Sequence, residues 1–417
     1  MTASVPHLPE PGDVIELAVG EVASGGWCVA RTGSGPVVFV RHALPGERVR
    51  ALITQTTSRF ARADAVQILD ASADRVPPPC PYAHPGGCGG CDWQHAGLPA
   101  QRALKAAVIG QQLRRIAGID REVTVEAMPG DETGLGWRTR VKFAVGRGGR
   151  AGLRGHRSHE VMEIEDCLIA HPLIETAAVT GRRWPGAASV EVAVAPGSGQ
   201  RALIVSGRRG AERGPAHLRQ RAAGRDWRVS ATGFWQVHPA AADTLAAAVL
   251  DALRPRPGDA VLDLYCGAGL FAGVLADAVG PSGAVTGIEA DTAAVRDARH
   301  NLRGTPWARV HRGDAAALLE RNGPSGATLA VVDPPRTGLA RKVVDLLSAP
   351  SPEGTAGRRA RRSGRVSRIA YVSCDPATLA RDMAAFGAAG WELEALRAFD
   401  AFPMTHHVEC LATLARD

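Results

Sequence analysis

One cysteine stands where the chain could make it chemically reactive. Cys374 follows the β-prone run Ile369 to Val372, and Asp375-Pro376 then opens a stretch with helical spacing. The thiol is therefore expected at a strand-to-helix junction, where free backbone amides and the positive end of the helix dipole favour a thiolate. Such a thiolate could act as a nucleophile. The alternative is a buried structural cysteine that packs as a small hydrophobe.

A second group of cysteines has the spacing of metal ligands. Three of them follow a proline linker in the pattern C-x7-C-x2-C: Cys80, Cys88 and Cys91. Glycines between the last two let the backbone fold tightly around a soft metal centre. Three ligands require a fourth, and Cys167 is the best candidate, since Cys266 and Cys374 belong to other motifs and Cys28 lies in an N-terminal barrel. The spacing predicts a bound metal but leaves zinc and an iron–sulfur cluster open.

The C-terminal part has the pattern of a doubly wound α/β domain. The apolar strand Ala260 to Leu264 precedes a glycine turn, Gly267-Ala-Gly269, and a helix, and Val285 to Glu289 forms a second strand that ends in an acid. Glu289 is placed to bond the ribose hydroxyls of a nucleoside cofactor. The hydride-transfer fingerprint is absent, because Ala272 stands at its third glycine position. An acid on each of the two strands looks instead like an S-adenosylmethionine methyltransferase.

Two further strands bring acids to the same edge. Val310 to Asp314 is a third strand, whose Asp314 is expected near the adenine, and Ala330 to Asp333 is a fourth that opens onto the site. The two prolines after Asp333 stiffen the loop and leave few free amides. Beyond them, the segment 350–368 is rich in Ser, Gly, Pro and Arg and is expected to be a mobile loop that could touch RNA.

The N-terminal part predicts a small β-barrel. Short alternating β runs separated by glycine-bearing turns extend from Asp13 to about Asp70. Five arginines punctuate these runs: Arg41, Arg48, Arg50, Arg59 and Arg62. They suit an RNA-binding barrel that contacts phosphates, with a solvated charged face as the open alternative. The segment resembles a TRAM domain, an OB-like module of RNA-modifying enzymes.

Between barrel and C-terminal domain, residues 80 to about 225 predict a mostly β segment. A helix is expected over Gln101 to Ile116, and Trp137 to Phe143 is a basic strand. Its cationic side chains alternate onto one face: Arg138, Arg140 and Lys142. This face is either an RNA groove or merely solvated.

Composition narrows the class of protein. The chain of 417 residues predicts two or three domains, and its net charge of +7, carried almost entirely by arginine, favours nucleic acid as a partner. Eight cysteines are too few for a disulfide scaffold and fit a reducing compartment. No stretch approaches the roughly 18 apolar residues of a membrane span, and the N-terminus lacks a targeting pattern. We expect a cytoplasmic protein.

Together these motifs resemble the S-adenosylmethionine-dependent RNA 5-methyluridine methyltransferases, in the form with a TRAM domain and an iron–sulfur cluster. The resemblance runs from about residue 12 to the C-terminus. Besides the four cysteines it is carried by Phe234-Trp-Gln236, Asp263-Leu-Tyr-Cys-Gly-Ala-Gly269, Asp333-Pro-Pro-Arg336, Ser373-Cys374-Asp-Pro and Phe402-Pro-Met-Thr-His-His-Val-Glu409. It implies a [4Fe–4S] cluster, Cys374 as the nucleophile and Glu409 as the base. It also implies that the cofactor site is lined by Gln236, Tyr265, Glu289 and Asp333.

The chain departs from the family pattern at two places. Where the family usually has Phe-x-Gln-x-Asn, this chain has His238 in place of the Asn, which alters a substrate-side contact. Seven residues separate the first two cluster cysteines, where five are more usual, so one loop is longer and no ligand is lost.

The expected architecture has three domains. Residues 1–72 form the OB-like TRAM barrel, 73–228 a central, mostly β, iron–sulfur and RNA-binding segment, and 229–417 an α/β Rossmann-like class I methyltransferase domain. The expected function is uracil-C5 methylation in ribosomal or transfer RNA by a monomer. Two alternatives remain open: an S-adenosylmethionine-dependent methyltransferase for another RNA base or a small molecule, and a non-catalytic RNA-binding or redox protein.

Overall fold

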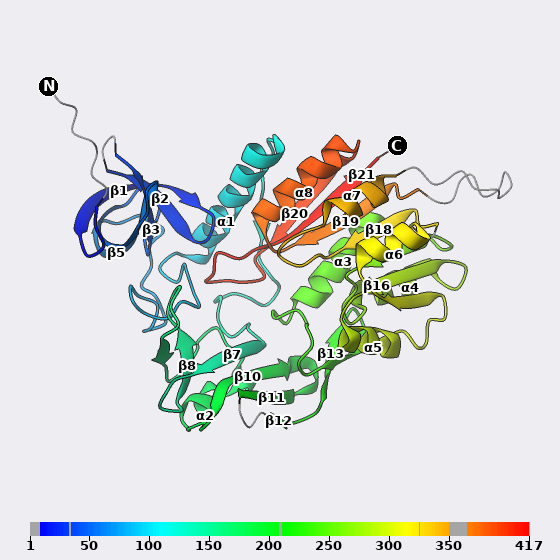
Figure 1. Ribbon diagram of the computed structural model, residues 1–417, viewed down its shortest axis with the longest axis horizontal. Helices are drawn as coiled ribbons and strands as arrows, with labels where there is room; N and C mark the ends of the chain where they lie inside the picture. Colours follow the sequence, from blue (N-terminus) through cyan, green and yellow to red (C-terminus); the bar gives the residue numbers. More distant parts are fainter. Residues whose placement is uncertain (1–8, 33–34, 208–210, 325, 350–364, 417) are drawn as a thin grey trace.

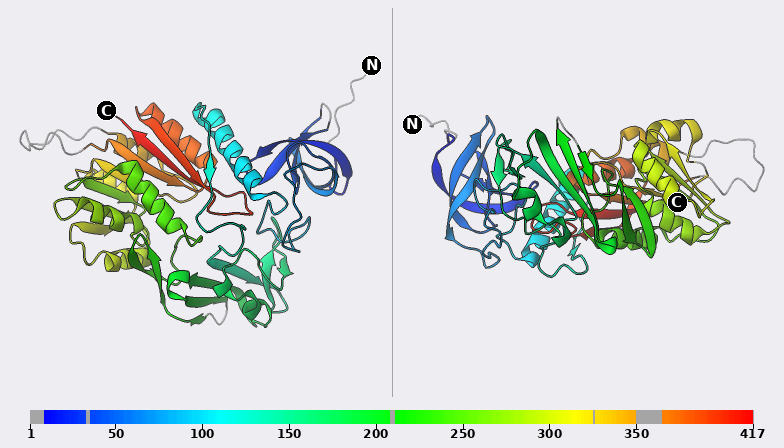
Figure 2. Two further views of the ribbon diagram at one scale, coloured as in Figure 1. Left: turned by 180° about the vertical axis from the view of Figure 1, so that it is seen from behind. Right: turned by 90° about the horizontal axis from the view of Figure 1, so that it is seen from below.

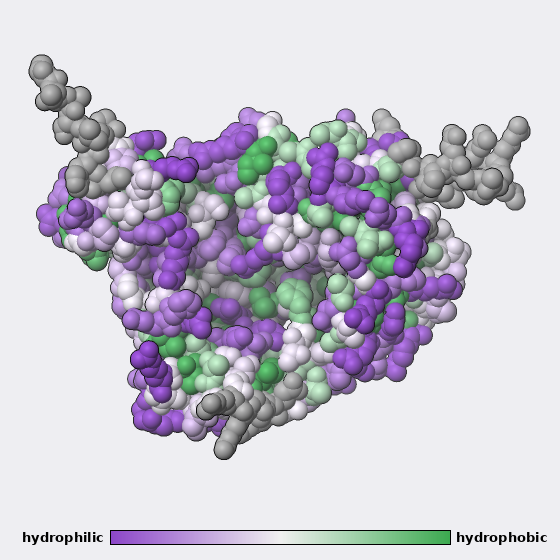
Figure 3. All heavy atoms as spheres, viewed as in Figure 1, coloured by the Kyte–Doolittle hydropathy of each residue, from purple (hydrophilic) through white to green (hydrophobic). Residues whose placement is uncertain are grey.

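The fold is described from a computed structural model, which forms a barrel, a central sheet and a C-terminal α/β domain (Figure 1). The described residues are 9–32, 35–207, 211–324, 326–349 and 365–416. The expected loop 350–368 lies almost wholly outside them. In the space-filling view the face between the three parts is hollowed (Figure 3).

The N-terminal barrel forms as the sequence predicts. Its five strands close in the order β1-β2-β3-β5-β4, and alternating residues such as Val38, Val40 and Val49 point into the core. The strands are β1 (Val14–Ala23), β2 (Trp27–Arg31), β3 (Val37–Arg41), β4 (Arg48–Thr56) and β5 (Phe60–Asp70).

The central part is an antiparallel six-stranded sheet with the order β12-β11-β10-β7-β8-β9. Phe143, Val190 and Val192 lie in its core. Its strands are β7 (Arg140–Val145), β8 (Ala151–Arg154), β9 (Val161–Glu163), β10 (Ala187–Ala195), β11 (Gln200–Gly207) and β12 (Ala211–Arg213). Short helical turns cover Pro172–Ile174, Thr176–Thr180 (α2) and Pro196–Ser198.

The expected basic face of this sheet does not form. Strand β7 begins only at Arg140, so Arg138 lies outside it and donates a hydrogen bond to the Arg140 carbonyl. Arg140 itself forms an ion pair with Glu191 at 2.6 Å on the neighbouring strand. Of the three cations only Lys142 is exposed, because the other two satisfy local partners.

The C-terminal domain is an eight-stranded sheet with the order β17-β16-β15-β18-β19-β21-β20-β6, and helices cover both faces (Figures 1 and 2). Its principal strands are β15 (Ala260–Leu264), β16 (Ala284–Glu289), β17 (Ala308–Arg312), β18 (Leu329–Val332), β19 (Arg368–Ser373), β20 (Glu392–Phe399) and β21 (Glu409–Ala415). Its helices are α3 (Ala241–Leu253), α4 (Leu270–Val279), α5 (Thr292–Asn301), α6 (Ala315–Asn322), α7 (Arg341–Ser348) and α8 (Pro376–Ala388).

Strand direction brings the candidate residues to one edge. Strands β15 to β19 run parallel, so their carboxyl ends meet at the same edge of the sheet. Strand β21 runs antiparallel to β19, with Cys410 opposite Ser373. The first residue of β21, Glu409, therefore lies at the edge where β19 ends.

Both flanks of the expected central segment pack on the C-terminal domain. Strand β6 (Val125–Glu126) joins its sheet by pairing with β20. Helix α1 (Leu98–Gln112) and the π-helical turn after it (Leu113–Ala117) pack on α8. Helix α1 starts before the expected Gln101, with a proline in its first turn. The hairpin β13 (His217–Ala222) and β14 (Arg225–Ser230) packs on α5. The domain limits at 72 and 228 stay predictions.

A network of hydrogen bonds fastens α1 and the segment after the cysteines to the loop 400–407. The amides of Asp92 and Trp93 donate to the Met404 carbonyl at 2.9 and 3.0 Å. Lys105, fully buried, forms an ion pair with Asp400 and donates to a loop carbonyl. Across the described residues, no helix is both long and apolar enough to cross a membrane.

The buried pair of Lys105 and Asp400 gives a stability prediction. Lys105→Ala should lower the free energy of unfolding by about 3–5 kcal/mol, because it leaves the Asp400 carboxylate buried without a partner. The double variant Lys105→Met/Asp400→Leu should recover most of this loss. Lys142→Ala, at an exposed lysine, is the control and should change stability by less than about 0.5 kcal/mol. Urea denaturation would measure all three, and wild-type stability of Lys105→Ala would contradict the prediction.

Candidate active site

The structure brings Cys374 and Glu409 together from neighbouring strands. Cys374 lies between β19 and α8, and the charge of Glu409 acts directly on its thiol. Asp333, which follows β18, and Arg336, from the loop after it, complete the group around the sulfur. A thiol, two carboxyl groups and one guanidinium therefore share this site.

The thiol of Cys374 is not a thiolate in the ligand-free protein. Burial and the neighbouring Glu409 raise its pKa to about 11, and Arg336 opposes the shift. The expected help from the helix dipole is small, because α8 is capped by Asp375, whose carboxylate accepts from the Thr378 amide at 2.8 Å. The sequence located the cysteine but did not show that the Asp375 carboxylate would occupy the N-terminus of the helix.

Burial also favours the neutral forms of the carboxyl groups of the site. Loss of solvent raises the pKa of Asp333 to about 7. Burial raises the pKa of Glu409 well above its ordinary value, and the nearby charge of Asp333 adds to the shift. Arg336 acts in the opposite direction on Glu409. A cation bound at this site would favour the charged forms and displace protons.

Asp263 is a site residue that the sequence analysis did not single out. It is completely buried at the end of β15, and neither carboxyl oxygen has a hydrogen-bond partner among the described residues. Burial raises its pKa to about 8, the neighbouring Ala272 amide opposes the shift, and Asp333 and Glu289 add to it. The carboxyl oxygens therefore have acceptor capacity left for a bound ligand. Its place on the first strand of the glycine motif was the available signal.

Three predicted cofactor residues gather beside the glycine turn. Glu289 accepts hydrogen bonds from the amides of Gly267 at 3.0 Å and Asp291 at 2.8 Å. Tyr265 adopts a left-handed backbone with φ of 64°, and burial together with Asp314 raises its pKa to about 12. A Cβ added at Gly267 would meet nothing within 4 Å, so the space above the turn is open to a ligand.

Asp314 lies at the edge of this group and also has a structural role. Its carboxylate caps α6 by accepting from the Ala317 amide at 2.9 Å. Four of the five predicted cofactor residues are linked by the charges that act among them: Tyr265, Glu289, Asp314 and Asp333. Gln236 lines a cavity of about 370 Å³ with Trp235, next to the β13–β14 hairpin, and its place in the cofactor site stays a prediction.

His238, which replaces the usual Asn, is a packed residue. It is buried, and its ring stacks on Trp137 with 6.1 Å between ring centres. Its Nδ1 accepts from the Ala240 amide at 3.2 Å, and its Nε2 lies 3.5 Å from Asp131. The substitution therefore serves the contact between central and C-terminal parts.

A cavity of about 130 Å³ opens on the barrel side of Cys374. Its walls come from the barrel turn 23–25, the segment after the cysteines, α1, the loop after β18, the start of α8 and the loop before β21: Ala23, Ser24, Gly25, Trp93, Val108, Arg336, Cys374, Asp375, Pro376, His406 and His407. Asp92 fixes one wall, since its carboxylate accepts from His406 Nδ1 at 2.6 Å. Burial and His406 lower the pKa of His407 to about 3, so this ring is neutral. The barrel is thus part of the pocket beside Cys374.

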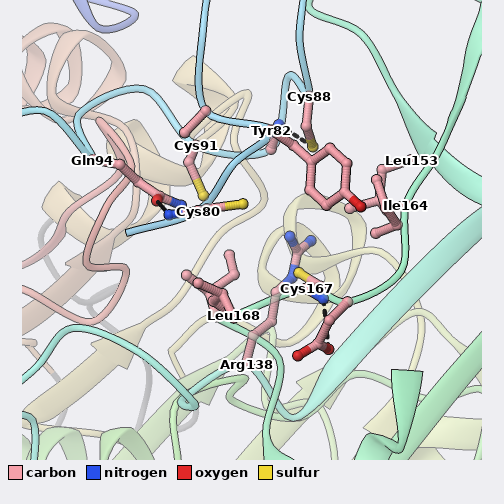
Figure 4. A pocket seen from close by; sticks show the side chains of 14 residues that line it. Cys80, Tyr82, Cys88, Cys91, Gln94, Arg138, Leu153, Ile164, Cys167 and Leu168 are labelled. Carbon is pink, nitrogen blue, oxygen red and sulfur yellow. Dashed lines mark hydrogen bonds between the residues drawn. The ribbon is translucent and has the colours of Figure 1, made fainter. Parts of the chain in front are cut away.

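The four predicted metal cysteines line one further cavity (Figure 4). Cys80, Cys88 and Cys91 come from the segment after the barrel, and Cys167 approaches from the central part beside Arg138. Burial raises the pKa of Cys167 to about 11 and also raises that of Cys88. No three Cys, His, Asp or Glu side chains of the described residues are arranged to hold a metal ion. The predicted metal centre is therefore not confirmed.

Three family models match parts of the chain. Residues 10–66 match the TRAM domain, 261–340 match a methyltransferase domain, and 327–417 match tRNA (Uracil-5-)-methyltransferase. The last match contains Asp333, Cys374 and Glu409.

Known relatives extend the likeness to the whole chain. A Streptomyces avermitilis protein described as an uncharacterized RNA methyltransferase is 49% identical, over 97% of this chain and 98% of that protein. A Bifidobacterium longum protein with the same description is 34% identical, over 96% of each. The crystal structure of Pyrococcus abyssi tRNA (uracil-54, C5)-methyltransferase shares the fold, with a TM-score of 0.68 and 20% identity over 95% of this chain and 99% of that one. The chain belongs to the RNA methyltransferase family, and it combines a TRAM domain with the C-terminal domain of the tRNA (uracil-5-)-methyltransferases.

Proposed function

We propose that this protein methylates C5 of a uridine in RNA, with S-adenosylmethionine as the methyl donor and a covalent adduct between Cys374 and uracil C6. The observation that carries the proposal is the meeting of a cysteine thiol and a buried carboxyl at the edge of a methyltransferase sheet. Methyl transfer to oxygen or nitrogen needs no such pair. Methyl transfer to an unreactive ring carbon does, because the ring must first be activated and later lose a proton.

The chemistry assigns a separate step to each residue. The Cys374 thiol gives up its proton to solvent, and the sulfur adds to C6 while the C5–C6 electron pair moves toward O4 as an enolate. The enolate carbon C5 then takes the methyl group, and the donor leaves as S-adenosylhomocysteine. Glu409 loses its own proton when the cationic cofactor binds. It then removes the proton from C5, and the electrons of that bond expel the sulfur from C6. Arg336 lies near the sulfur and stabilises its anionic form.

The target base must leave its stack to reach the sulfur, and the cavity beside Cys374 is the place proposed for it. Phe234 is 70% exposed on the loop that joins the central and C-terminal parts, and an exposed aromatic ring offers a surface for stacking a base. A small-molecule methyltransferase would have no use for a pocket wall built by a TRAM barrel. This argues against the small-molecule alternative.

The residues of the sheet edge fit S-adenosylmethionine. This cofactor supplies an electrophilic methyl group on a positively charged sulfur. The unpaired carboxyl of Asp263 and the raised pKa of Asp333 suit a ligand that carries positive charge. Glu289 is placed to accept from the ribose, and Asp314 and Tyr265 lie next to it on the adenine side.

The RNA class stays open between transfer and ribosomal RNA. The family model that matches residues 327–417 is named for tRNA, but phosphate-binding arginines carry no sequence information. We propose that the protein acts in the cytoplasm, since its eight cysteines suit a reducing compartment. We also propose that it acts as a monomer.

We also propose that Cys80, Cys88, Cys91 and Cys167 hold an iron–sulfur cluster, of the [4Fe–4S] type. Four thiols that line one cavity give the donor set of such a cluster. The place of these cysteines, next to Asp92 and the loop 400–407, suggests a structural role.

The cofactor assignment predicts a pH-dependent affinity. Asp263 and Asp333 have pKa values of about 8 and 7 in the empty site, so they are partly protonated at neutral pH. A cationic ligand favours the charged carboxylates, so protons leave on binding and affinity for S-adenosylmethionine should rise as pH increases from 6 to 8. Calorimetry in two buffers of different ionisation enthalpy should detect this release. S-adenosylhomocysteine, without the sulfonium charge, should show a weaker dependence.

Variants separate the parts of this site. Glu289→Ala and Asp333→Ala should each weaken cofactor binding, while RNA binding stays largely intact. Asp263→Asn should reduce the proton release. It should also flatten the pH dependence of stability. The pKa of Asp263 in the folded protein lies above the unfolded value of 3.8, so the wild-type protein without cofactor loses stability as pH rises toward about 8. Unchanged cofactor affinity in both Glu289→Ala and Asp333→Ala would reject the assignment.

The cluster proposal predicts iron and sulfide in protein purified without oxygen. Changing any one of the four cysteines to serine should reduce both contents, whereas Cys28→Ser, inside the barrel, should leave them unchanged. Chemical analysis of iron, sulfide and zinc would decide. Stoichiometric zinc without iron or sulfide would contradict the iron–sulfur proposal.

Separate variants test the nucleophile and the base. Glu409→Gln should still add to uracil and transfer the methyl group, but it cannot remove the C5 proton, so a protein–RNA adduct should accumulate on a denaturing gel. Cys374→Ala should form neither adduct nor product while still binding RNA. Because the two residues act as a unit, the double variant should be about as inactive as Cys374→Ala alone. An adduct formed by Cys374→Ala would assign the nucleophile elsewhere, with Cys266 the first thiol to examine.

The same variants test the function in cells. Cells that lack the gene should lose 5-methyluridine at one RNA position, and the wild-type gene should restore it. The Cys374→Ala gene should not. Unchanged 5-methyluridine in ribosomal and transfer RNA of the deletion strain would contradict the proposed function.

A further inference from the structure

Three guanidinium groups converge on the side chain of Trp27. The guanidinium carbons of Arg41, Arg62 and Arg157 lie 5.9, 5.7 and 5.9 Å from the centre of the Trp27 ring. The ring of His156 meets the same indole edge-on, with 5.6 Å between centres. Arg41 and Arg62 belong to barrel strands β3 and β5, whereas Arg157 belongs to the central part. The group therefore spans the boundary between barrel and central part.

Cation–π attraction does not account for three cations at one ring. Such a contact is worth about 0.5–1 kcal/mol at an exposed site, and each added cation repels those already present. The Arg157 charge acts on both Arg41 and Arg62 and lowers the pKa of each, in addition to burial. Two of the three, Arg62 and Arg157, remain accessible to solvent. Arg62 also stacks on Phe60 and donates to Gln55, neither of which carries charge, so a compensating negative charge would stabilise the arrangement.

The protein supplies too little of that charge. Arg41 Nη2 lies 3.8 Å from Asp92 Oδ1, which is beyond hydrogen-bond distance, while Asp92 Oδ2 accepts from the ring and the amide of His406 at 2.6 and 3.1 Å. Asp64 is near Arg41 as well, and burial raises its pKa. Arg41 is 4% exposed, and its Nη2 has no hydrogen-bond partner in the described part of the chain. A buried guanidinium nitrogen is thus left for an acceptor that the protein does not provide.

The backbone holds Arg157 in this group at a cost. Its φ of 50° is left-handed, which costs a residue with a side chain about 1–2 kcal/mol. The loop is pinned to the segment of the cysteines, because the Gly89 amide donates to the Arg154 carbonyl at 3.0 Å. A Cβ at Gly89 would lie 2.5 Å from the His156 nitrogen, so only glycine permits this approach. The position of Arg157 is therefore imposed by the fold.

The group lies next to the pocket of the nucleophile. Trp27 begins β2 directly after the turn whose residues 23–25 line the cavity beside Cys374. The turn also touches Asp92, since a Cβ at Gly26 would lie 2.9 Å from the Asp92 Cβ. An anion bound by the three arginines would thus be separated from the pocket by a single turn of the barrel.

We propose that Arg41, Arg62 and Arg157 form a phosphodiester-binding site that holds the RNA backbone beside the target base. This inference rests on the proposed RNA substrate. A phosphate supplies the missing negative charge, accepts from several guanidinium nitrogens at once, and belongs to every nucleotide of the substrate. Because the arginines come from two parts of the protein, a bound phosphate also joins the barrel to the central part next to the pocket.

The test measures RNA binding by Arg62→Gln and Arg157→Gln over a range of salt concentrations. Arg31→Gln is the matched control, an exposed arginine at the other end of β2. Each site variant should weaken RNA binding about three- to tenfold and reduce the slope of log affinity against log salt by about 0.7–0.9, the effect of one lost phosphate contact. In turnover with RNA, KM should rise and kcat should change little. Cofactor affinity should stay unchanged in all three variants, which shows that they are folded.

Each result decides for or against the site. Wild-type affinity and slope in both site variants would overturn the inference, and so would an equal loss in Arg31→Gln, which would indicate diffuse charge. If inorganic phosphate binds the wild type but the RNA salt slope is the same in all variants, the site takes a free anion and the RNA assignment is wrong. A wild-type protein that neither binds nor methylates RNA would instead reject the proposed function. The two failures are thus distinguishable.

Discussion

The structure depends on the attachment of the loop 400–407 to the segment that follows the cysteines. Asp92 holds His406, the Gln101 side chain accepts from the Met404 amide at 2.8 Å, and Lys105 pairs with Asp400. These contacts join residues about 300 positions apart in the chain. The loop leads directly into Glu409, so Glu409, the pocket wall and the cysteine segment are fixed by the same network. Asp92 directly follows Cys91, so this network begins next to the cysteines.

The second constraint is burial, which favours the neutral forms of the three acids and of the thiol. Asp263, Asp333, Glu409 and Cys374 all have raised pKa values, and desolvation is the first cause of each. Arg336 alone opposes this for Glu409 and Cys374. In the proposed reaction a cationic cofactor restores the charged forms of the acids, and Glu409 becomes a base only then. In this proposal the electrostatics of the site couple the protonation of Cys374 and Glu409 to cofactor binding.

Rules of local sequence located much of the fold and of the site. Alternation and turn residues predicted the barrel, and the strand patterns placed Glu289 and Asp333 at the cofactor site and Cys374 at a strand-to-helix junction. Those rules fail where the answer depends on contacts between distant segments. They did not reveal that Asp375 caps α8, that Arg138 and Arg140 bind local partners, or that Asp263 stays unpaired. The contact of Asp92 with His406 joins residues 314 positions apart, which no local pattern encodes.

The fusion of a barrel to a methyltransferase domain has a physical reason in this structure. A uridine that leaves its stack loses stacking energy, and the pocket must offset that cost while the flanking backbone stays fixed. The barrel contributes to both tasks. Its turn 23–25 forms a wall beside Cys374, and three arginines lie against the ring of Trp27, two residues further along the chain. A barrel that only tethered RNA could be joined by a flexible linker. One that shapes the pocket must be held rigidly, which explains why Arg41 reaches Asp92 and why the cysteine segment packs between barrel and sheet.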